Sequence, residues 1–134
     1  MRTAIGIIVG IIVAMATIWV MEAGTHLLYP TAPMDLNDPE GVKRIVAGMP
    51  VPAKLLILLG WLIGAAAGAF TAVTVARRAW ASWVPAGVVF FAGVANLFLI
   101  PHPWWMNIGA VTVPILGGWL GRKLALDRLA RTSP

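Results

Sequence analysis

The chain has 134 residues, of which 60% are hydrophobic and 11% are charged, whereas an ordinary soluble domain has about 25% charged residues. This balance predicts a protein embedded in lipid, and the length admits a single domain of four spanning helices. The chain has no cysteine, which excludes disulfides, thiolate metal sites and iron–sulfur clusters. The formal charge of +5 comes from basic residues whose positions indicate a membrane topology, so we expect no nucleic-acid partner.

The first predicted helix covers about residues 3–29 and contains an uncharged run over residues 4–21. Eighteen residues of α-helix are about 27 Å long, close to the thickness of the hydrocarbon core. Within this run Gly6, Gly10 and Ala14 recur every four residues. Such a ridge of small residues predicts close approach of another helix backbone.

The end of this helix carries Glu22 and His26, which lie on one face one turn apart, and Tyr29 extends that face. An ionisable group in or beside a membrane helix is a candidate functional site, because burying it unpaired costs several kcal/mol. The alternative interpretation is that Glu22 is hydrated at the headgroup level or makes a structural hydrogen bond.

The loop over residues 30–52 is rich in proline and acidic residues. Asn37 or Asp38 can cap a short helix that has Pro39 in its first turn and ends at Gly48. This short helix has one apolar side, and we expect it to lie flat on the membrane surface or to cover the end of the bundle. That apolar side consists of Val42, Ile45 and Val46.

The second spanning helix, predicted at about 53–77, has the most regular pattern in the chain. Small residues recur every four positions at Gly60, Gly64, Gly68, Ala72 and Ala76. Small residues promote helix packing in lipid, where no hydrophobic force drives helices together. The pattern fits either packing within one molecule or a face for self-association, the arrangement called a glycine zipper.

The third and fourth spanning helices are predicted at about 83–100 and 104–126. They are separated by Pro101, His102 and Pro103, since proline cannot continue a helix. Asn96 lies just over one turn before this break, and its amide needs a partner if it is buried. Gly117 and Gly121 are further candidates for close helix packing. Tryptophans often anchor a helix at the membrane interface, and the candidates near this end are Trp19, Trp61, Trp104 and Trp105.

The basic residues define a topology. Seven of them fall on one side of the predicted bundle (Arg2, Arg77, Arg78, Arg122, Lys123, Arg128 and Arg131) and three on the other (Lys43, Arg44 and Lys54). Because positive charge favours the cytoplasm, we expect both termini inside and a multi-pass location in the bacterial inner membrane.

This topology places one set of polar side chains at the outer end of the bundle, where they can converge as ligand-binding residues: Glu22, His26, Tyr29, Asn96 and His102. Two imidazoles and one carboxylate, from Glu22, His26 and His102, are a plausible set for a divalent metal such as zinc or for a non-haem iron site, and haem held by the two histidines is a weaker alternative. A proton-linked or lipid-headgroup site using Glu22 and His26 is the alternative. No metalloprotease or paired Glu-x-x-His motif supports the metal.

Four segments of the chain are similar to segments of a known family: residues 22–30, residues 37–40, Gly60 and Trp61 with Gly64, and Asn96 with residues 100–103. In these segments the chain resembles an uncharacterised family of small bacterial four-helix inner-membrane proteins. The resemblance implies the four-helix topology and no activity, cofactor or site.

The sequence predicts an all-α, four-helix integral membrane bundle with both termini inside and a short interfacial helix in its first outer loop. No nucleotide-binding loop or nucleophile motif is present, so we expect a protein that is not an enzyme. Its predicted function is helix–helix association, as a homo-oligomer or an accessory subunit, with the lipid bilayer and itself or another membrane protein as partners. The alternative is a ligand-handling protein, either a metal-binding enzyme or a small proton-linked transporter, that uses Glu22, His26 and His102.

Overall fold

The computed structural model describes residues 1–132, and all the regular structure in that part of the chain is helical. Four long helices and two short ones follow in order: α1 (Arg2–Leu28), α2 (Pro39–Gly48), α3 (Val51–Ala76), the 3₁₀ helix η1 (Ala79–Ser82), α4 (Trp83–Leu99) and α5 (Trp104–Thr132). The predicted helices agree with these bounds to within two residues, except that α5 continues six residues past its predicted end at 126.

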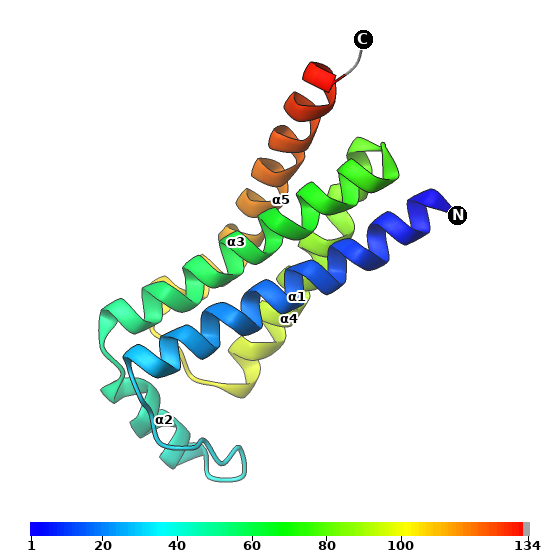
Figure 1. Ribbon diagram of the computed structural model, residues 1–134. Coiled ribbons are helices and arrows are strands. Elements are labelled where there is room, and N and C mark those ends of the chain that lie inside the picture. The colour runs from blue at the N-terminus through cyan, green and yellow to red at the C-terminus, as the bar shows by residue number, and fades with distance from the viewer. Residues whose placement is uncertain (133–134) are drawn as a thin grey trace.

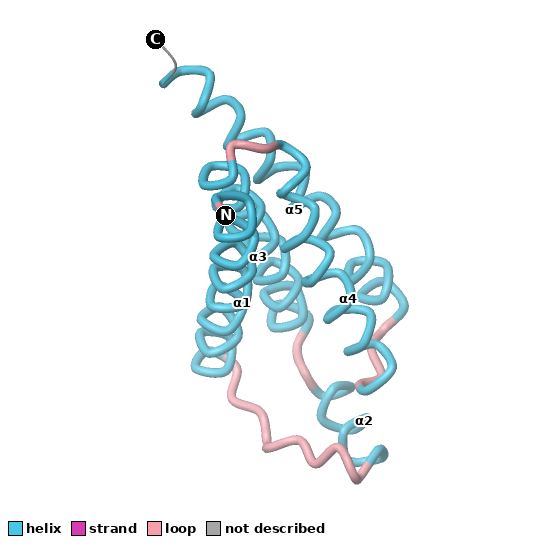
Figure 2. Tube along the Cα trace, turned by 90° about the vertical axis from the view of Figure 1, so that its right-hand side faces the viewer, coloured by secondary structure: helices cyan, strands magenta, loops and turns pink. Residues whose placement is uncertain are grey.

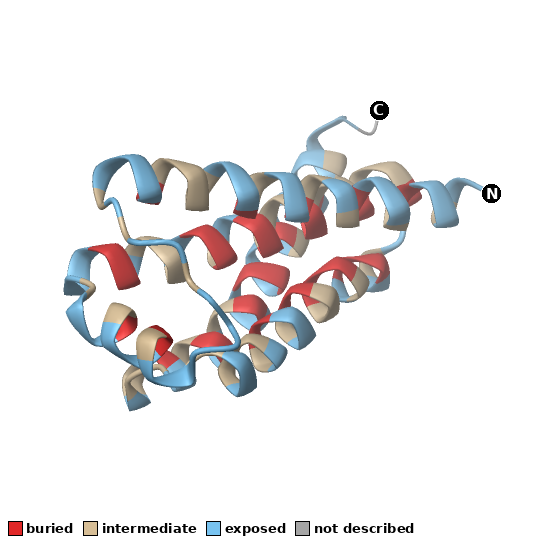
Figure 3. Ribbon diagram, turned by 90° about the horizontal axis from the view of Figure 1, so that it is seen from below, coloured by how far each residue is buried: buried red, intermediate tan, exposed pale blue. Residues whose placement is uncertain are grey.

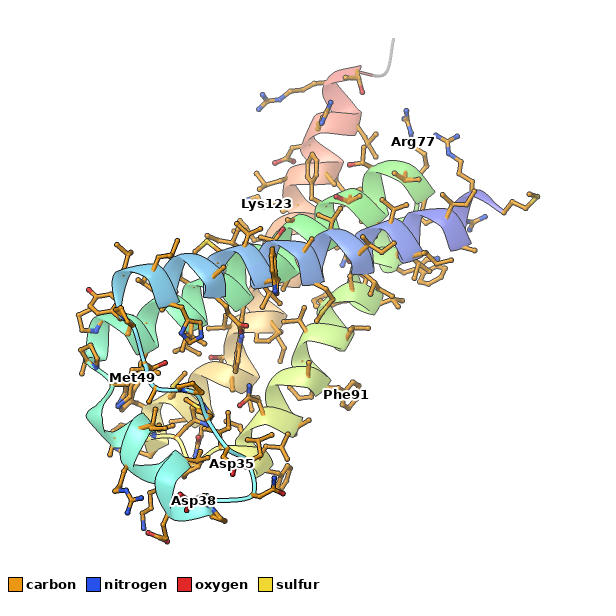
Figure 4. The ribbon with its side chains drawn as sticks, turned by 60° about the horizontal axis from the view of Figure 1, so that its bottom comes forward. Asp35, Asp38, Met49, Arg77, Phe91 and Lys123 are labelled. Carbon is orange, nitrogen blue, oxygen red and sulfur yellow. The ribbon has the colours of Figure 1, made fainter. Side chains whose placement is uncertain are left out.

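Helix α3 is the centre of the fold, since it packs along α1 on one side and along α5 on the other, with α4 also against it (Figure 1). The start of α1 and the end of α5 lie at the end of the bundle opposite α2 (Figure 2). The same end holds Arg77 and Lys123, whereas Asp35 and Asp38 lie at the α2 end (Figure 4). We refer to these as the terminal end and the α2 end.

Three stretches are long and apolar enough to cross a membrane: Arg2–Leu28, Val51–Ala76 and Ala79–Leu99. Helix α5 is not among them, because Asn107, Thr112, Pro114 and several glycines dilute its apolar residues before the basic end. The expectation of four spans from hydropathy is therefore met for three. The outward faces of the helices are apolar, as in Ile12 and Trp19 of α1, which are 60% and 72% exposed, and buried residues line the inner faces (Figure 3). Such a surface suits lipid.

Helices α1 and α3 approach each other through small residues. A Cβ atom added at Gly10 would lie 2.7 Å from the carbonyl oxygen of Gly68, and one added at Gly68 would lie 2.6 Å from the carbonyl oxygen of Gly10. The predicted ridge of Gly6, Gly10 and Ala14 is buried as expected. Close backbone contact replaces the hydrophobic force that lipid cannot supply.

Helix α5 reaches the other side of α3 in the same way. A Cβ atom at Gly117 would lie 2.6 Å from the carbonyl oxygen of Leu62, and one at Gly121 would overlap the carbonyl oxygen of Ala66. The small residues of α3, from Gly60 to Ala76, are buried within the molecule. Of the two interpretations of this stripe, packing within one molecule is the one observed. The stripe of Gly60, Gly64 and Gly68 is covered by α1, so a second copy cannot pack against it.

The terminal end is held by specific backbone contacts. Arg77 adopts a left-handed conformation with φ 56°, which ends α3. The Nε atom of Arg2 donates a hydrogen bond to the carbonyl oxygen of Val75, at 2.8 Å. Further along α5, the guanidinium of Arg128 lies 5.7 Å from the ring centre of Phe70. These contacts fix the start of α1 and the far part of α5 to α3.

At the α2 end, the short helix forms as its sequence predicts. A side-chain oxygen of Asp38 accepts a hydrogen bond of 3.0 Å from the backbone N–H of Gly41, and Pro39 occupies the first turn. Val42 and Val46 are buried, whereas Lys43 and Arg44 are exposed. Helix α2 therefore turns its apolar side toward the bundle.

Candidate functional site

A cavity of about 440 Å³ lies at the α2 end, bordered by α1, α3, the end of α4 and the start of α5. This volume is in the range of small-molecule sites, about 300–1,000 Å³. Its walls combine apolar and polar side chains, and the polar ones are Glu22, Thr25, His26, Tyr29, Thr31, Lys54, Asn96 and His102. We call it the end cavity.

All five side chains that the sequence proposes as ligand-binding residues line the end cavity: Glu22, His26, Tyr29, Asn96 and His102. They come from α1, from α4 and from the turn before α5, segments that are far apart in the sequence. An antiparallel arrangement of α1, α3 and α4 brings these helix ends together, as the sequence predicts. Their role as ligand contacts stays a prediction.

Two polar atoms at this site are buried without a hydrogen-bond partner in the described part of the chain: Oδ1 of Asn96 and Nδ1 of His102. Native proteins pair nearly all of their buried polar atoms. Leaving such an atom unpaired costs about 1–3 kcal/mol. These two atoms therefore favour a polar group from outside the chain as a partner.

The imidazole of His102 is electrostatically perturbed. Burial lowers its pKa below the usual 6.5, a hydrogen bond with the backbone of Ile100 opposes this change, and the nearby positive charge of Lys54 lowers the pKa further. At neutral pH His102 is thus an uncharged imidazole, which can donate from one ring nitrogen and accept at the other.

Lys54 is the site residue that the sequence analysis missed, since it was considered only as a topology marker. It lies in the first turn of α3 and is 8% exposed. Its side chain has no hydrogen bond or ion pair with residues 1–132. The signal was present in the sequence, because Lys54 is a charge bordering a long apolar run, the criterion that singled out Glu22.

Trp61 and Met106 form part of the apolar wall and are 5% and 1% exposed. The expectation that Trp61 anchors the bundle at the membrane interface is therefore wrong. Trp61 follows Lys54 by seven residues, two helical turns, and shares its face of α3. Trp19 and Trp104, which are 72% and 74% exposed, remain compatible with an anchoring role.

The structure does not have the geometry that the predicted metal site requires. Among residues 1–132, no group of three His, Cys, Asp or Glu side chains is placed to hold a metal ion. Glu22, His26 and His102 share the cavity without forming such a group. The Nδ1 atom of His26 lies 3.4 Å from Oγ1 of Thr31 instead, so this imidazole has a neighbour within the adjoining loop.

The segment around α2 borders the cavity from the other side. Val46 of α2 and Met49, which follows it, contribute to the lining together with residues 31–34 of the preceding loop. Figure 4 shows Met49 at the α2 end, between α2 and α3. The arrangement agrees with the predicted alternative in which the short helix covers the end of the bundle.

Comparisons of this chain with protein-family models, with curated proteins and with solved structures give no match.

Proposed function

We propose that this chain is a multi-pass protein of the bacterial inner membrane that binds a small amphiphilic molecule in the end cavity. One observation carries the proposal: a single cavity brings together the polar side chains of three distant segments, and two of its buried polar atoms, Asn96 Oδ1 and His102 Nδ1, have no partner in the described chain. Apolar walls from Trp61 and Met106 beside these polar groups suit a ligand that has both characters.

The topology in this proposal has four crossings with both termini in the cytoplasm. Helix α5 contributes the fourth crossing, since it lies along α3 through Gly117 and Gly121. The excess of arginine and lysine at the terminal end supports this orientation. The end cavity then lies near the outer surface of the membrane.

Association with a second copy or with another membrane protein stays a weaker candidate. The glycine face that motivated it is used within the molecule. The apolar faces that remain exposed are those that lipid would cover. Binding in the cavity is therefore the function that the structure supports best.

The test is to fill the cavity and follow a bound molecule. The protein is purified in a mild detergent and examined by native mass spectrometry, which we expect to show a bound amphiphile. Thr31→Trp places a large side chain at the cavity from a loop, and we expect it to remove the bound mass. Leu36→Trp is the matched control, because Leu36 lies in the same loop, is 57% exposed and does not line the cavity.

Loss of the bound mass in both variants, or in neither, would contradict the proposal. Ala53→Phe fills the cavity from the wall of α3, where Ala53 is 1% exposed, and provides a second variant if the loop adapts. Folding of each variant is checked by its circular dichroism and by a single symmetric peak in gel filtration.

A further inference from the structure

One positively charged and one negatively charged side chain line the end cavity. Among the described lining residues, Glu22 and Lys54 are the two with a formal charge at neutral pH. Glu22 comes from α1 and Lys54 from α3, and they form no ion pair with each other. The cavity is therefore neutral overall but has a positive and a negative group that face the same space.

The surroundings of Lys54 favour an anionic group. The residue is 8% exposed and its ammonium has no ion pair with residues 1–132, and an ammonium that borders a partly apolar cavity is stabilised by an opposite charge or by hydrogen bonds. His102 lies close enough for the charge of Lys54 to perturb it. The neutral imidazole uses its one N–H for the backbone of Ile100, so its unpartnered Nδ1 is an acceptor and Lys54 is the donor for the anion.

The other polar groups favour a cationic group. The Glu22 carboxylate accepts hydrogen bonds, and so does the buried Oδ1 of Asn96, which has no donor among the described residues. A pure anion at Lys54 would experience repulsion from Glu22, whereas a ligand that also carries an ammonium would not.

We propose that the end cavity recognises a zwitterionic ligand, with its phosphate or carboxylate at Lys54 and its ammonium at Glu22 and Asn96. This inference rests on the proposed function and names the chemical class of its ligand. Ethanolamine phospholipid headgroups and water-soluble zwitterions, such as free amino acids or phosphoethanolamine, share this chemistry. The apolar wall of Trp61, Ile57 and Met106 can contact an acyl chain, which favours the lipid as the source.

The experiment compares two single-chain lipids that differ by the ammonium group. Binding of lysophosphatidylethanolamine and of lysophosphatidic acid to the purified full chain is measured by titration calorimetry in phosphatidylglycerol nanodiscs. We expect the ethanolamine lipid to bind at least about tenfold more tightly, corresponding to roughly 1.4 kcal/mol. Equal or tighter binding of lysophosphatidic acid would overturn the proposal, and this comparison requires no mutation.

Two substitutions then assign the charges. Glu22→Gln is expected to remove the preference for the ethanolamine lipid without weakening the binding of lysophosphatidic acid. Lys54→Met is expected to weaken the binding of both lipids by about tenfold or more. Glu40→Gln and Lys43→Met are the matched controls, because both residues are exposed on α2 and lie outside the cavity lining. Equal loss of both lipids in Glu22→Gln would contradict the assigned role of Glu22.

Two more ligands separate the sources and the two proposals. Free phosphoethanolamine that binds as tightly as the ethanolamine lipid would support the zwitterion and identify a water-soluble source, while much weaker binding would identify the lipid. If an uncharged monoacylglycerol binds as tightly as the ethanolamine lipid, the proposed function stands and the zwitterion inference fails. If no amphiphile binds, both fail.

Discussion

The two ends of the bundle are packed in opposite ways by the same helices. At the terminal end α1 and α3 meet backbone to backbone, so that Gly6 and Gly10 leave no room for a Cβ atom against Ala72, Ala76 and Gly68. At the α2 end the same two helices carry Glu22, Lys54 and Trp61 and border a cavity of about 440 Å³. The change follows the sequence, because the ridge of small residues in α1 gives way to Ile18 and then to polar side chains.

The difference between the two ends explains how a small membrane protein can hold a site. A cavity that contains unpaired polar groups is unfavourable, and close contacts elsewhere must keep the helices in place. The glycines of α1, α3 and α5 supply those contacts over most of the bundle. Substitutions at the two ends should therefore affect the protein differently, from a large loss of stability at the terminal end to small changes at the α2 end.

The largest effect is expected from Gly68→Leu, at the tightest crossing of α1 and α3. A Cβ atom there meets the carbonyl oxygen of Gly10 at 2.6 Å and the Cβ atom of Ala14 at 2.7 Å. Neither neighbour can yield without moving a helix, so we expect destabilisation by about 3 kcal/mol or more, the upper part of the usual overpacking range. Thermal unfolding in detergent, followed by circular dichroism, measures it.

Gly87→Leu is the control for this substitution. Gly87 is also helical, and a Cβ atom there would have no neighbour within 4 Å. We expect it to unfold at the temperature of the unmodified protein or slightly above, because leucine favours the helix more than glycine does. Similar destabilisation of both variants would show that the terminal end is not the rigid part of the bundle.

An intermediate effect of opposite sign is expected from Lys54→Met at the α2 end. The substitution removes an ammonium that borders the cavity without an ion pair, and it keeps most of the side-chain volume. We expect the protein without ligand to gain about 1 kcal/mol or slightly more, the lower part of the range for an unsatisfied polar group, because the ammonium is accessible from the cavity. A lower melting temperature than that of the exposed control Lys43→Met would show that Lys54 stabilises the fold instead.

A smaller effect is expected from Asp38→Ala, which removes the N-cap of α2. Loss of such a cap costs about 1 kcal/mol. Because Val46 and Met49 border the cavity, we expect faster amide hydrogen exchange over residues 39–48 and weaker ligand binding, with the terminal end unchanged. Asp38→Asn keeps an acceptor at the cap and should restore slow exchange; equally fast exchange in that variant would contradict the capping role.

The smallest effect is a pH dependence due to His102. Its pKa is lowered below 6.5 in the folded protein, mainly by burial, so the unfolded chain binds more protons as the pH falls below 6.5. The contribution of His102 to the free energy of unfolding is therefore complete above pH 6.5 and is lost as the pH falls from 6.5 through the pKa of the folded state. We expect melting temperatures that decrease below pH 6.5, and a shallower slope in His102→Asn.

His26→Asn is the matched control for the pH experiment. His26 is the other histidine of the chain, and its side chain is exposed. We expect this variant to keep the slope of the unmodified protein. A slope that disappears with His26→Asn and persists with His102→Asn would show that His26 causes the pH dependence, and would contradict the role of His102.

Much of the fold could be predicted from the chain. Long uncharged runs give the helices, the prolines around His102 give the turn before α5, and Asp38 with Pro39 gives the start of α2. The direction of the glycine stripe could not be predicted, because in lipid the same spacing serves contacts within one molecule and between molecules. Contacts with Gly10 and Ala14 decide this in favour of the former.

The site was predicted in part. Charge and polarity at helix ends identified Glu22, His26 and His102, since the antiparallel order of the helices brings those ends together. Spacing along the sequence could not show that these three groups fail to form a metal-binding cluster. It also could not show that Lys54 and Trp61 point into the cavity. A shift of one residue along a helix turns a side chain by about 100° around the axis, which is enough to move it from the interior to lipid.

The position of Trp61 gives the protein an optical reporter of its own cavity. Trp61 is 5% exposed and Trp105 is half-buried, whereas Trp19, Trp80, Trp83, Trp104 and Trp119 are 41–74% exposed. Brominated acyl chains in the surrounding bilayer should therefore quench the emission of those five indoles and spare that of Trp61. A ligand whose own chain is brominated should quench Trp61 on arrival, so that occupancy can be followed by fluorescence in an intact membrane.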